Sequence, residues 1–303
     1  MNHRQPIVIT IGVFDGVHKG HQALIRETVR WAKRLKAVPV AVTFQDHPMH
    51  VVHGQTRIPF LLRREETFRL LKSHGLKRVV AVRFTKAFSS KSPPQFVDWL
   101  QAQGHIQGIV VGENFRFGQG AKGDVRLLRQ LGRQGGFKVA ALRPVRVGGR
   151  VVSSSLIRGL LMAGKLVEAN RLLGRPYAIA GQVVHGKHVG HKIGFPTANL
   201  GTIGEFLPRD GVYACAVPLG RKLYRAGMNL GKRPTFKDDK HHRQAEVHLL
   251  RYYGKLYGRH MRVYLLDYLR PEKKFASSKA LVAQIRKDLK RVQRASFRGV
   301  PKA

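Results

Sequence analysis

The stretch Thr10-Ile11-Gly12-Val13-Phe14-Asp15-Gly16-Val17-His18-Lys19-Gly20-His21 decides the fold of the first half of this chain. An apolar run leads into a turn with three glycines. Leu24, Thr28, Trp31 and Leu35 then follow at the spacing of one helix face. Free N–H groups and a partial positive charge lie at a helix N-terminus, so this order of strand, turn and helix suits phosphate binding.

Further apolar runs alternate with helical patterns across the first half. Most lack a strict apolar–polar alternation, as expected for strands buried on both faces of a parallel sheet. This alternation of strands and helices predicts a doubly wound α/β fold with its ligand site at the carboxyl ends of the strands. The predicted strands are Ile7–Val13, Val38–Phe44, Arg78–Phe84, Gly108–Gly112 and Lys138–Leu142.

The pattern changes after Gly174-Arg175-Pro176, where a glycine and a proline end a helix. We therefore expect two domains, residues 1–175 and 176–303. The second half has short β-branched or aromatic runs between Gly- and Pro-containing turns, which predict an antiparallel sheet or small barrel. A last helix is predicted from near Ser277-Ser278, with a solvated and partly disordered tail beyond Asp288. The predicted strands are Gly211–Val217, Ala245–Leu250 and Met261–Leu269.

The composition is that of a globular protein with an unusual charge. Hydrophobic residues make up 43% and charged residues 24%, which excludes a disordered tail protein or a disulfide-stapled miniprotein. The 56 Lys+Arg against 17 Asp+Glu give a net charge of +39, which attracts polyanions such as nucleic acid, anionic lipid and phosphorylated small molecules. The single Cys215 has no disulfide partner. We expect a cytoplasmic protein, because the apolar run from Ile7 is too short for a membrane span and lacks a signal-peptide pattern.

His18 and His21 are the candidate catalytic residues of the first half. They are three residues apart, so one helical turn can aim both at the same anion, and Gly20 lets a phosphate approach the backbone. Two imidazoles there can stabilise charge on a phosphoryl group during displacement. Two alternatives stay open. The pair can be surface histidines near a turn, among 15 in the chain, or zinc ligands, although no third ligand has suitable spacing.

The pattern G-x-F-D-G-x-H-x-G-H resembles the HxGH nucleotidyltransferase signature of bacterial bifunctional riboflavin kinase/FAD synthetases. The resemblance implies a Rossmann-like domain that transfers AMP from ATP to FMN and releases pyrophosphate. Ser153-Ser154-Ser155-Leu156-Ile157-Arg158 resembles the family's S-S-[ST]-x-I-R motif, whose hydroxyls and arginine can hold phosphates, although an ordinary helix N-cap is the alternative. The implied ATP-binding residues are Gly12, Phe14, Asp15, Gly20, Ser153, Ser154, Ser155 and Arg158.

Two intermediate segments carry the same resemblance. Gly112-Glu113-Asn114-Phe115-Arg116-Phe117-Gly118 resembles the family's G-x-[DN]-F-x-F-G loop near the flavin. Asn114, Phe115 and Phe117 are therefore expected to contact flavin, with core packing as the alternative for the two rings. Thr43-Phe44-Gln45-Asp46-His47-Pro48 resembles T-F-x-P-H-P, with Asp46 in place of the usual proline.

Residues 181–199 resemble the riboflavin kinase signature G-x-V-x-x-G…G-F-P-T-A-N. The resemblance implies a small antiparallel β-barrel with a C-terminal helix that phosphorylates riboflavin with ATP. The Thr197 hydroxyl and the Asn199 carbonyl oxygen are hard ligands suited to Mg²⁺, with a simple turn as the alternative. His191 stands where the family usually has arginine. The implied ATP-binding residues are Gly181, Gly186, Lys187, Lys192, Gly194, Pro196 and Thr197.

Glu246 is the candidate catalytic base of the second half, because it occupies the position of the family's catalytic glutamate. Residues 229–235 resemble the element N-[IV]-G-x-R-P-T, and residues 207–213 resemble P-x-x-G-V-Y. A kinase acting on an alcohol needs a carboxylate near the hydroxyl to accept its proton. A surface glutamate on a strand is the alternative, but with only 17 acids in the chain an acid at this position favours function.

Together these features predict a bifunctional enzyme that converts riboflavin to FMN and FMN to FAD, with ATP as co-substrate and Mg²⁺ as cofactor. Two other classes stay open: a basic nucleic-acid-binding protein, and a degenerate paralogue that binds flavin without turnover. The basic residues are spread along the chain and form no known nucleic-acid module. We therefore expect nonspecific polyanion binding at most, no membrane partner, and a monomer or weak homo-oligomer.

Overall fold

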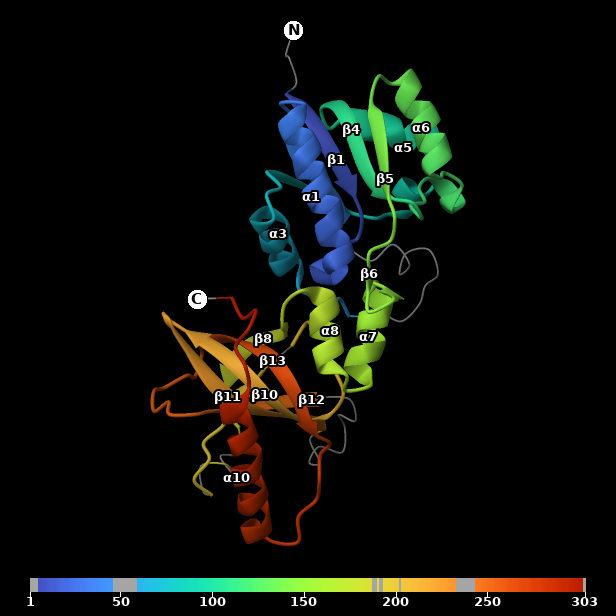
Figure 1. The fold of residues 1–303 in the computed structure, drawn as a ribbon. Helices are drawn as coiled ribbons and strands as arrows, with labels where there is room; N and C mark the ends of the chain where they lie inside the picture. The colour runs from blue at the N-terminus through green and yellow to red at the C-terminus, as the bar shows by residue number, and fades with distance from the viewer. Residues whose placement is uncertain are drawn as a thin grey trace. The chain divides into compact units, whose positions relative to one another are not determined.

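The computed structural model describes residues 5–45, 59–186, 190, 193–201, 203–232 and 243–301. Its backbone contacts divide the chain into two compact units, drawn as a ribbon in Figure 1. The first unit comprises residues 1–58 and 63–153, and the second comprises residues 59–62 and 154–303.

A five-stranded parallel sheet forms the centre of the first unit, in the order β3-β2-β1-β4-β5. The prediction of a doubly wound α/β fold is confirmed. The chain moves outward from β1 in one direction and then from β4 in the other, so the loops after β1 and β4 flank a topological switch point. The strands are β1 (Pro6–Ile11), β2 (Val38–Phe44), β3 (Arg78–Val82), β4 (His105–Gly112) and β5 (Lys138–Leu142).

Helices cover both faces of this sheet, because successive side chains of a buried strand point to opposite faces. Ile7 and Ile9 pack on one face with Phe96 of α5, whereas Val8 packs on the other with Trp31 of α1. The helices are α1 (Lys19–Arg34), α3 (Arg64–Ser73), α4 (Lys86–Ser89), α5 (Pro93–Gln101) and α6 (Val125–Gln134), with short 3₁₀ turns η1 (Asp15–Val17) and η2 (Gln119–Ala121) and a hairpin of β6 (Arg146–Val147) and β7 (Arg150–Val151).

A closed antiparallel barrel, in the order β10-β11-β12-β9-β8-β13, forms the second unit. The prediction of a small barrel with a C-terminal helix is confirmed. One predicted loop is different: Gly181 lies inside a strand and pairs with Met261, so it is not part of a phosphate-wrapping loop. The elements are α7 (Ser154–Met162), α8 (Leu166–Leu173), β8 (Tyr177–Val184), β9 (Ala198–Leu200), β10 (Gly211–Leu219), β11 (Lys222–Lys232), β12 (Arg243–Leu249), β13 (His260–Arg270) and α10 (Ser278–Arg294).

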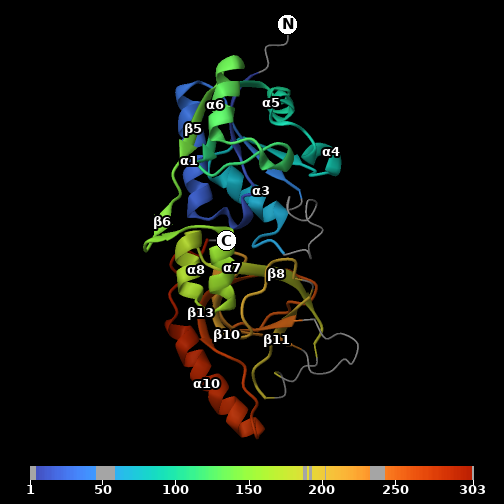
Figure 2. The ribbon, with the colours of Figure 1, turned by 90° about the vertical axis from the view of Figure 1, so that its right-hand side faces the viewer.

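Helix α10 lies along the outside of the barrel, as both ribbon views show (Figures 1 and 2). It begins at its N-cap Ser277, whose side chain accepts a hydrogen bond from the backbone N–H of Ala280. The prediction of a partly disordered tail beyond Asp288 is wrong for residues 289–294, which remain helical, although Lys290, Arg291, Gln293 and Arg294 are exposed as expected. Val292 is fully buried, so the apolar face of the helix continues through this charged segment.

Helices α7 and α8 group with the barrel rather than with the parallel sheet. The side chain of Asn170 on α8 donates to the Leu265 carbonyl of β13 at 2.9 Å and accepts from the Tyr177 backbone N–H at 2.7 Å. Helix α8 ends at Gly174 with a left-handed C-cap, as its sequence indicates. A border between catalytic domains at residues 175/176 stays a prediction.

Candidate active sites

The two histidines after β1 lie together as predicted. Their contact is a stacking of the two rings, which their spacing on a helical turn did not indicate. His18 has an extended backbone and is the N-cap of α1, and its Nδ1 accepts a hydrogen bond from the His21 N–H at 3.3 Å. The two imidazoles stack with centroids 3.6 Å apart and planes 14° apart. Because Nδ1 of His18 accepts, the proton of its neutral ring lies on Nε2.

The turn before His18 is strained, and its side chains are buried. Phe14 and Val17 have φ angles of 52° and 41°, a region that costs a non-glycine residue energy and is most often seen at functional sites. Phe14 is fully buried, and its ring meets His21 edge-on at 5.3 Å. Asp15 is also buried. Phe14 therefore packs against the imidazole of the candidate catalytic residue His21. A contact of Phe14 or Asp15 with ATP stays a prediction.

Gly20 leaves room for the His18 ring. A Cβ atom at this position would lie 3.0 Å from Cε1 and 3.1 Å from Nδ1 of His18. Real Cβ atoms rarely approach neighbours this closely, so any larger residue would push the ring out of its position. The glycine of the H-x-G-H pattern thus has a steric role within the histidine pair, in addition to its predicted role toward phosphate.

The Ser/Arg motif falls across the division between the units. Ser153 belongs to the first unit, whereas Ser154, Ser155 and Arg158 belong to α7 in the second. The Arg158 guanidinium lies over the Phe206 ring at 5.9 Å. Since the histidines are in the other unit, the two-part ATP clamp stays a prediction.

The loop after β4 holds the three residues predicted to contact flavin. Asn114 is exposed and Phe115 is half-buried, whereas Phe117 is only 5% exposed and packs in the core of the first unit. The rings of Phe115 and Phe117 stack at 5.6 Å. For Phe117 the structure thus agrees with the alternative, core packing, rather than with an exposed ring that could contact flavin. The departure at Asp46, with His47 and Pro48, lies outside the described residues.

A cavity of about 370 Å³ lies in the second unit, between the outer face of the barrel and α10. The lining includes Thr197, Asn229 and Glu246 from the barrel and its loops. Helix α10 contributes apolar side chains, among them Leu281 and Ile285, as well as Asp288. The structure thus places the predicted base and a predicted metal ligand in one cavity. The predicted phosphate contacts Lys187 and Lys192, and the departure at His191, lie outside the described residues.

Asn199 lies beside Glu246 on the same face of the sheet, since these residues are paired across β9 and β12. Its amide is buried against Gly186, and its Oδ1 accepts a hydrogen bond from Gln244 Nε2 at 2.6 Å. An amide oxygen has two lone pairs, so Oδ1 retains one for a cation. The hydroxyl of Thr197 is half-buried and lines the cavity. These hard oxygens fit Mg²⁺, which takes few protein ligands and binds mainly to substrate phosphates. Gly194 and Pro196 are exposed in the loop before β9.

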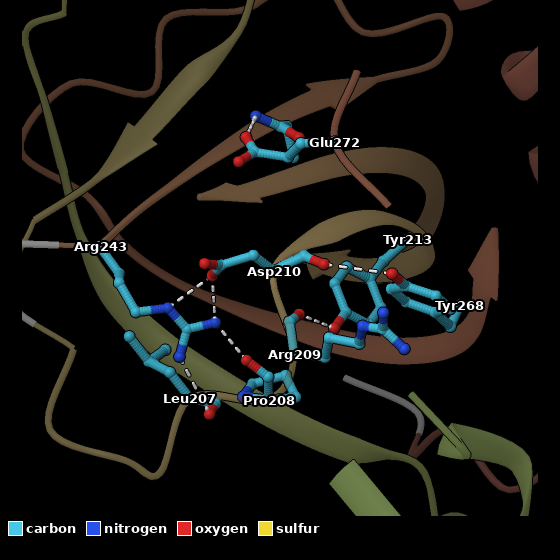
Figure 3. A network of polar contacts seen from close by, with 9 residues as sticks. Leu207, Pro208, Arg209, Asp210, Tyr213, Arg243, Tyr268 and Glu272 are labelled. Carbon is cyan, nitrogen blue, oxygen red and sulfur yellow. Dashed lines mark hydrogen bonds and ion pairs between the residues drawn. The ribbon is translucent and has the colours of Figure 1, made fainter. Parts of the chain in front are cut away.

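A polar network fixes the beginning of β12, three residues before Glu246 (Figure 3). The Arg243 guanidinium pairs with Asp210, with Nε 2.6 Å from Oδ1, and donates to the Leu207 and Pro208 carbonyls. Tyr213 donates to the Arg209 carbonyl. Burial of its ring raises the pKa of Tyr213, so its hydroxyl stays protonated at neutral pH. The sequence motif at 207–213 is thus an anchor for the strand that carries Glu246, and Arg243 is its unpredicted partner.

Four charged residues of the cavity carry no sequence motif: Arg270, Glu272, Lys273 and Asp288. Asp288 is 5% exposed and pairs with Arg270, with Oδ2 2.9 Å from Nε, which holds α10 against the end of β13. Breaking such a buried pair typically costs about 3–5 kcal/mol. The sequence did hold one signal for Asp288: it is an acid at a position that the helical pattern assigns to the apolar face.

Two searches of the described residues were negative. None of the helices seen there is long and apolar enough to cross a membrane. No cluster of three or more His, Cys, Asp or Glu side chains in those parts of the chain could hold a metal ion.

Comparisons with known proteins cover both units. Residues 1–156 match the FAD synthetase family model and residues 173–296 match the riboflavin kinase model. Bifunctional riboflavin kinase/FMN adenylyltransferases from Escherichia coli K12 and Pseudomonas fluorescens are 38% and 37% identical to this chain, each over 93% of it and 90% of the relative. A crystal structure from Streptococcus pneumoniae, described as a macrolide-efflux protein, has a TM-score of 0.90 at 31% identity and covers 96% of this chain and 95% of its own.

Proposed function

Because this chain belongs to the family of bifunctional riboflavin kinase/FMN adenylyltransferases, we propose that it makes FMN from riboflavin and then FAD from FMN. The observation that carries this proposal is the cavity of the second unit, which Glu246 and Thr197 line together with apolar side chains of α10. A flavin has a flat, largely apolar ring and a polyol chain, and a cavity with both apolar and polar lining matches both parts.

In the kinase reaction, the 5′-hydroxyl oxygen of riboflavin attacks the γ-phosphorus of ATP, and the bond to ADP breaks. Glu246 accepts the proton of that hydroxyl. The strand anchor at Arg243 keeps β12, and therefore the carboxylate, in a fixed position relative to the cavity. The loop residues Gly186, Lys187, Lys192, Gly194 and Pro196 surround the ATP phosphates in this proposal.

Thr197 and Asn199 would hold Mg²⁺ together with the ATP phosphates. When bound there, the ion supplies charge neutralisation to the phosphoryl oxygens. The chain's own contribution is to orient the two oxygens: Asn199 is on β9, Thr197 directly precedes that strand, and Gln244 fixes the amide of Asn199.

In the adenylyltransferase reaction, a phosphate oxygen of FMN attacks the α-phosphorus of ATP and pyrophosphate leaves. His18 and His21 donate hydrogen bonds to the phosphoryl oxygens as charge develops. Ser153, Ser154, Ser155 and Arg158 bind the leaving phosphates, and Asn114 and Phe115 contact the flavin. These roles are supported by the fixed tautomer of His18 and by the exposure of Asn114 at the carboxyl end of β4.

We place the border of the two catalytic domains between residues 175 and 176. The protein works in the cytoplasm as a monomer or weak homo-oligomer, with no specific nucleic-acid partner. Its net charge of +39 supports weak, nonspecific contact with polyanions, and we keep such binding as a second, minor property.

The test is to incubate the purified chain with riboflavin and Mg·ATP and to separate the flavins by chromatography. We expect FMN first and FAD later. Without added Mg²⁺ and with a chelator, neither product should form. A chain that binds flavin but forms neither product in the complete mixture is a degenerate paralogue, and that result refutes the proposal.

A further inference from the structure

A row of polar side chains crosses the outer face of the barrel at the cavity. Asn199 of β9 pairs with Glu246 of β12, and Glu246 pairs with Asn229 of β11. Side chains directly opposite each other in an antiparallel sheet share a face and lie about 5 Å apart at Cβ. Asn229 Nδ2 then donates to Glu272 Oε1 at 3.0 Å, so the row continues to the segment after β13.

From this row we infer that Asn229 recognises the polyol chain of the flavin, and that Glu272 is the positioning residue that sets its amide. The inference rests on the proposed kinase function and adds two residues to it. Both side chains line the cavity with Glu246. The roles of Asn229 and Glu272 are separate from that of the Glu246 carboxylate, which accepts the proton.

The chemistry of the pair fixes the orientation of the Asn229 amide. An ionised carboxylate only accepts hydrogen bonds, so the atom of Asn229 that faces Glu272 has to be the nitrogen. The amide oxygen is thereby left as the acceptor that Asn229 offers to the cavity. Without Glu272, the amide can rotate by half a turn and offer its N–H groups instead.

Gly231 allows this approach of Glu272 to the sheet. A Cβ atom on Gly231 would lie 2.0 Å from Glu272 Oε1, closer than atoms can approach. Gly231 and Asn229 are two residues apart on β11, so they lie on the same face of the strand. The carboxylate therefore occupies the space above the glycine and reaches the neighbouring asparagine.

Two acceptors side by side suit a polyol. Each hydroxyl of the ribityl chain can donate one hydrogen bond. While Glu246 accepts from the 5′-hydroxyl, the Asn229 oxygen, one strand away, is placed to accept from a neighbouring hydroxyl. A flavin whose ring carries only a methyl group in place of the ribityl chain has no such donor and gains nothing from Asn229.

The experiment compares two flavins on the full chain by fluorescence titration: riboflavin, and lumiflavin, which has the same ring without the ribityl chain. Glu272→Ala should weaken riboflavin binding by about threefold to tenfold, the value of one hydrogen bond, and leave lumiflavin binding unchanged. Asn229→Leu, which keeps the size of the side chain but offers no acceptor, should give the same pattern. Glu272→Gln should bind nearly as wild type, because its carbonyl oxygen still accepts from Asn229.

An unchanged circular dichroism spectrum and melting temperature report that the barrel of each variant is folded. If Glu272→Ala is unstable, Asn229→Leu carries the test alone, since it preserves size. Wild-type riboflavin affinity in the folded variants overturns the inference, and so does an equal loss for both flavins, which indicates only a structural role. A wild-type chain that binds riboflavin more tightly than lumiflavin but does not phosphorylate it overturns the proposed function. The fluorescence titration of the variants then still decides whether Asn229 and Glu272 recognise the polyol chain.

Discussion

Substitution of Gly20 by alanine should separate the stability of the first unit from its chemistry. Gly20 is in the first turn of α1 at an ordinary negative φ, where alanine is the better helix former by roughly 0.5–1 kcal/mol. The added Cβ, however, would lie 3.0 Å from the His18 ring. That ring is only 5% exposed and stacks on His21, so it has little room to move away.

A displacement of 1 Å at a reacting group can cost about 100-fold in rate, so a shift of a few tenths of an ångström should cost about fourfold to tenfold. We expect Gly20→Ala to lower FAD formation from FMN by this factor, with a melting temperature equal to or slightly above that of the wild type. Gly159→Ala on α7, where a Cβ meets nothing within 4 Å, reports the gain in helix stability alone.

Riboflavin phosphorylation by the same Gly20→Ala protein is the internal control, because the kinase residues lie in the other unit. Wild-type rates of FAD formation in this variant would refute the steric role of Gly20. A parallel loss of kinase activity and melting temperature would refute it as well, since the defect would then be one of folding.

Four other outcomes follow from the same geometry. Glu246→Gln should stop FMN formation but still adenylylate supplied FMN, as measured by flavin chromatography; loss of both activities in a folded protein contradicts the two-site model. His21→Ala should lower FAD formation by about 100-fold or more with unchanged circular dichroism, and near-wild-type turnover refutes its role. A fragment of residues 154–303, which keeps α8, should melt at a higher temperature than one of residues 176–303; equal melting contradicts the anchoring by α8. RNA binding, measured by fluorescence anisotropy, should fall steeply with salt and depend little on sequence, and a strong sequence preference reveals a missed function.

Much of the fold could be predicted because the periodicity of buried side chains is local. The strand over Val38–Phe44 and the helix that stops at Gly174 both agree with the structure, since an unbroken apolar run and a left-handed glycine are direct signals. The prediction of disorder just after Asp288 was wrong because the dense positive charge of this segment hides the single buried Val292, which holds the helix to the barrel. Charge is visible in any window of sequence, whereas burial of one side chain depends on the distant β10 and β11 strands.

The sequence predicted which residues belong to the candidate sites, but it did not predict how their side chains are arranged. His18, His21 and Glu246 stand in recognisable patterns, but ring stacking of the histidines depends on the extended backbone of His18, which its spacing from His21 does not reveal. Glu272 had no motif at all. Its place beside Asn229 follows from pairing between segments more than 40 residues apart, and only the barrel brings them together.

The short segment of residues 59–62 has a consequence for synthesis on the ribosome. It belongs to the second unit, where Leu61 is fully buried and the Phe60 carbonyl accepts a hydrogen bond from the Phe206 N–H at 2.8 Å. Phe206 is made roughly 150 residues later, so at about 5–20 residues per second Phe60 and Leu61 wait roughly 7–30 s for their partners. During that interval two large apolar side chains lack their partner in the second unit while β3, β4 and β5 of the parallel sheet are still being made, so this segment is open to premature association for much of the synthesis of the chain.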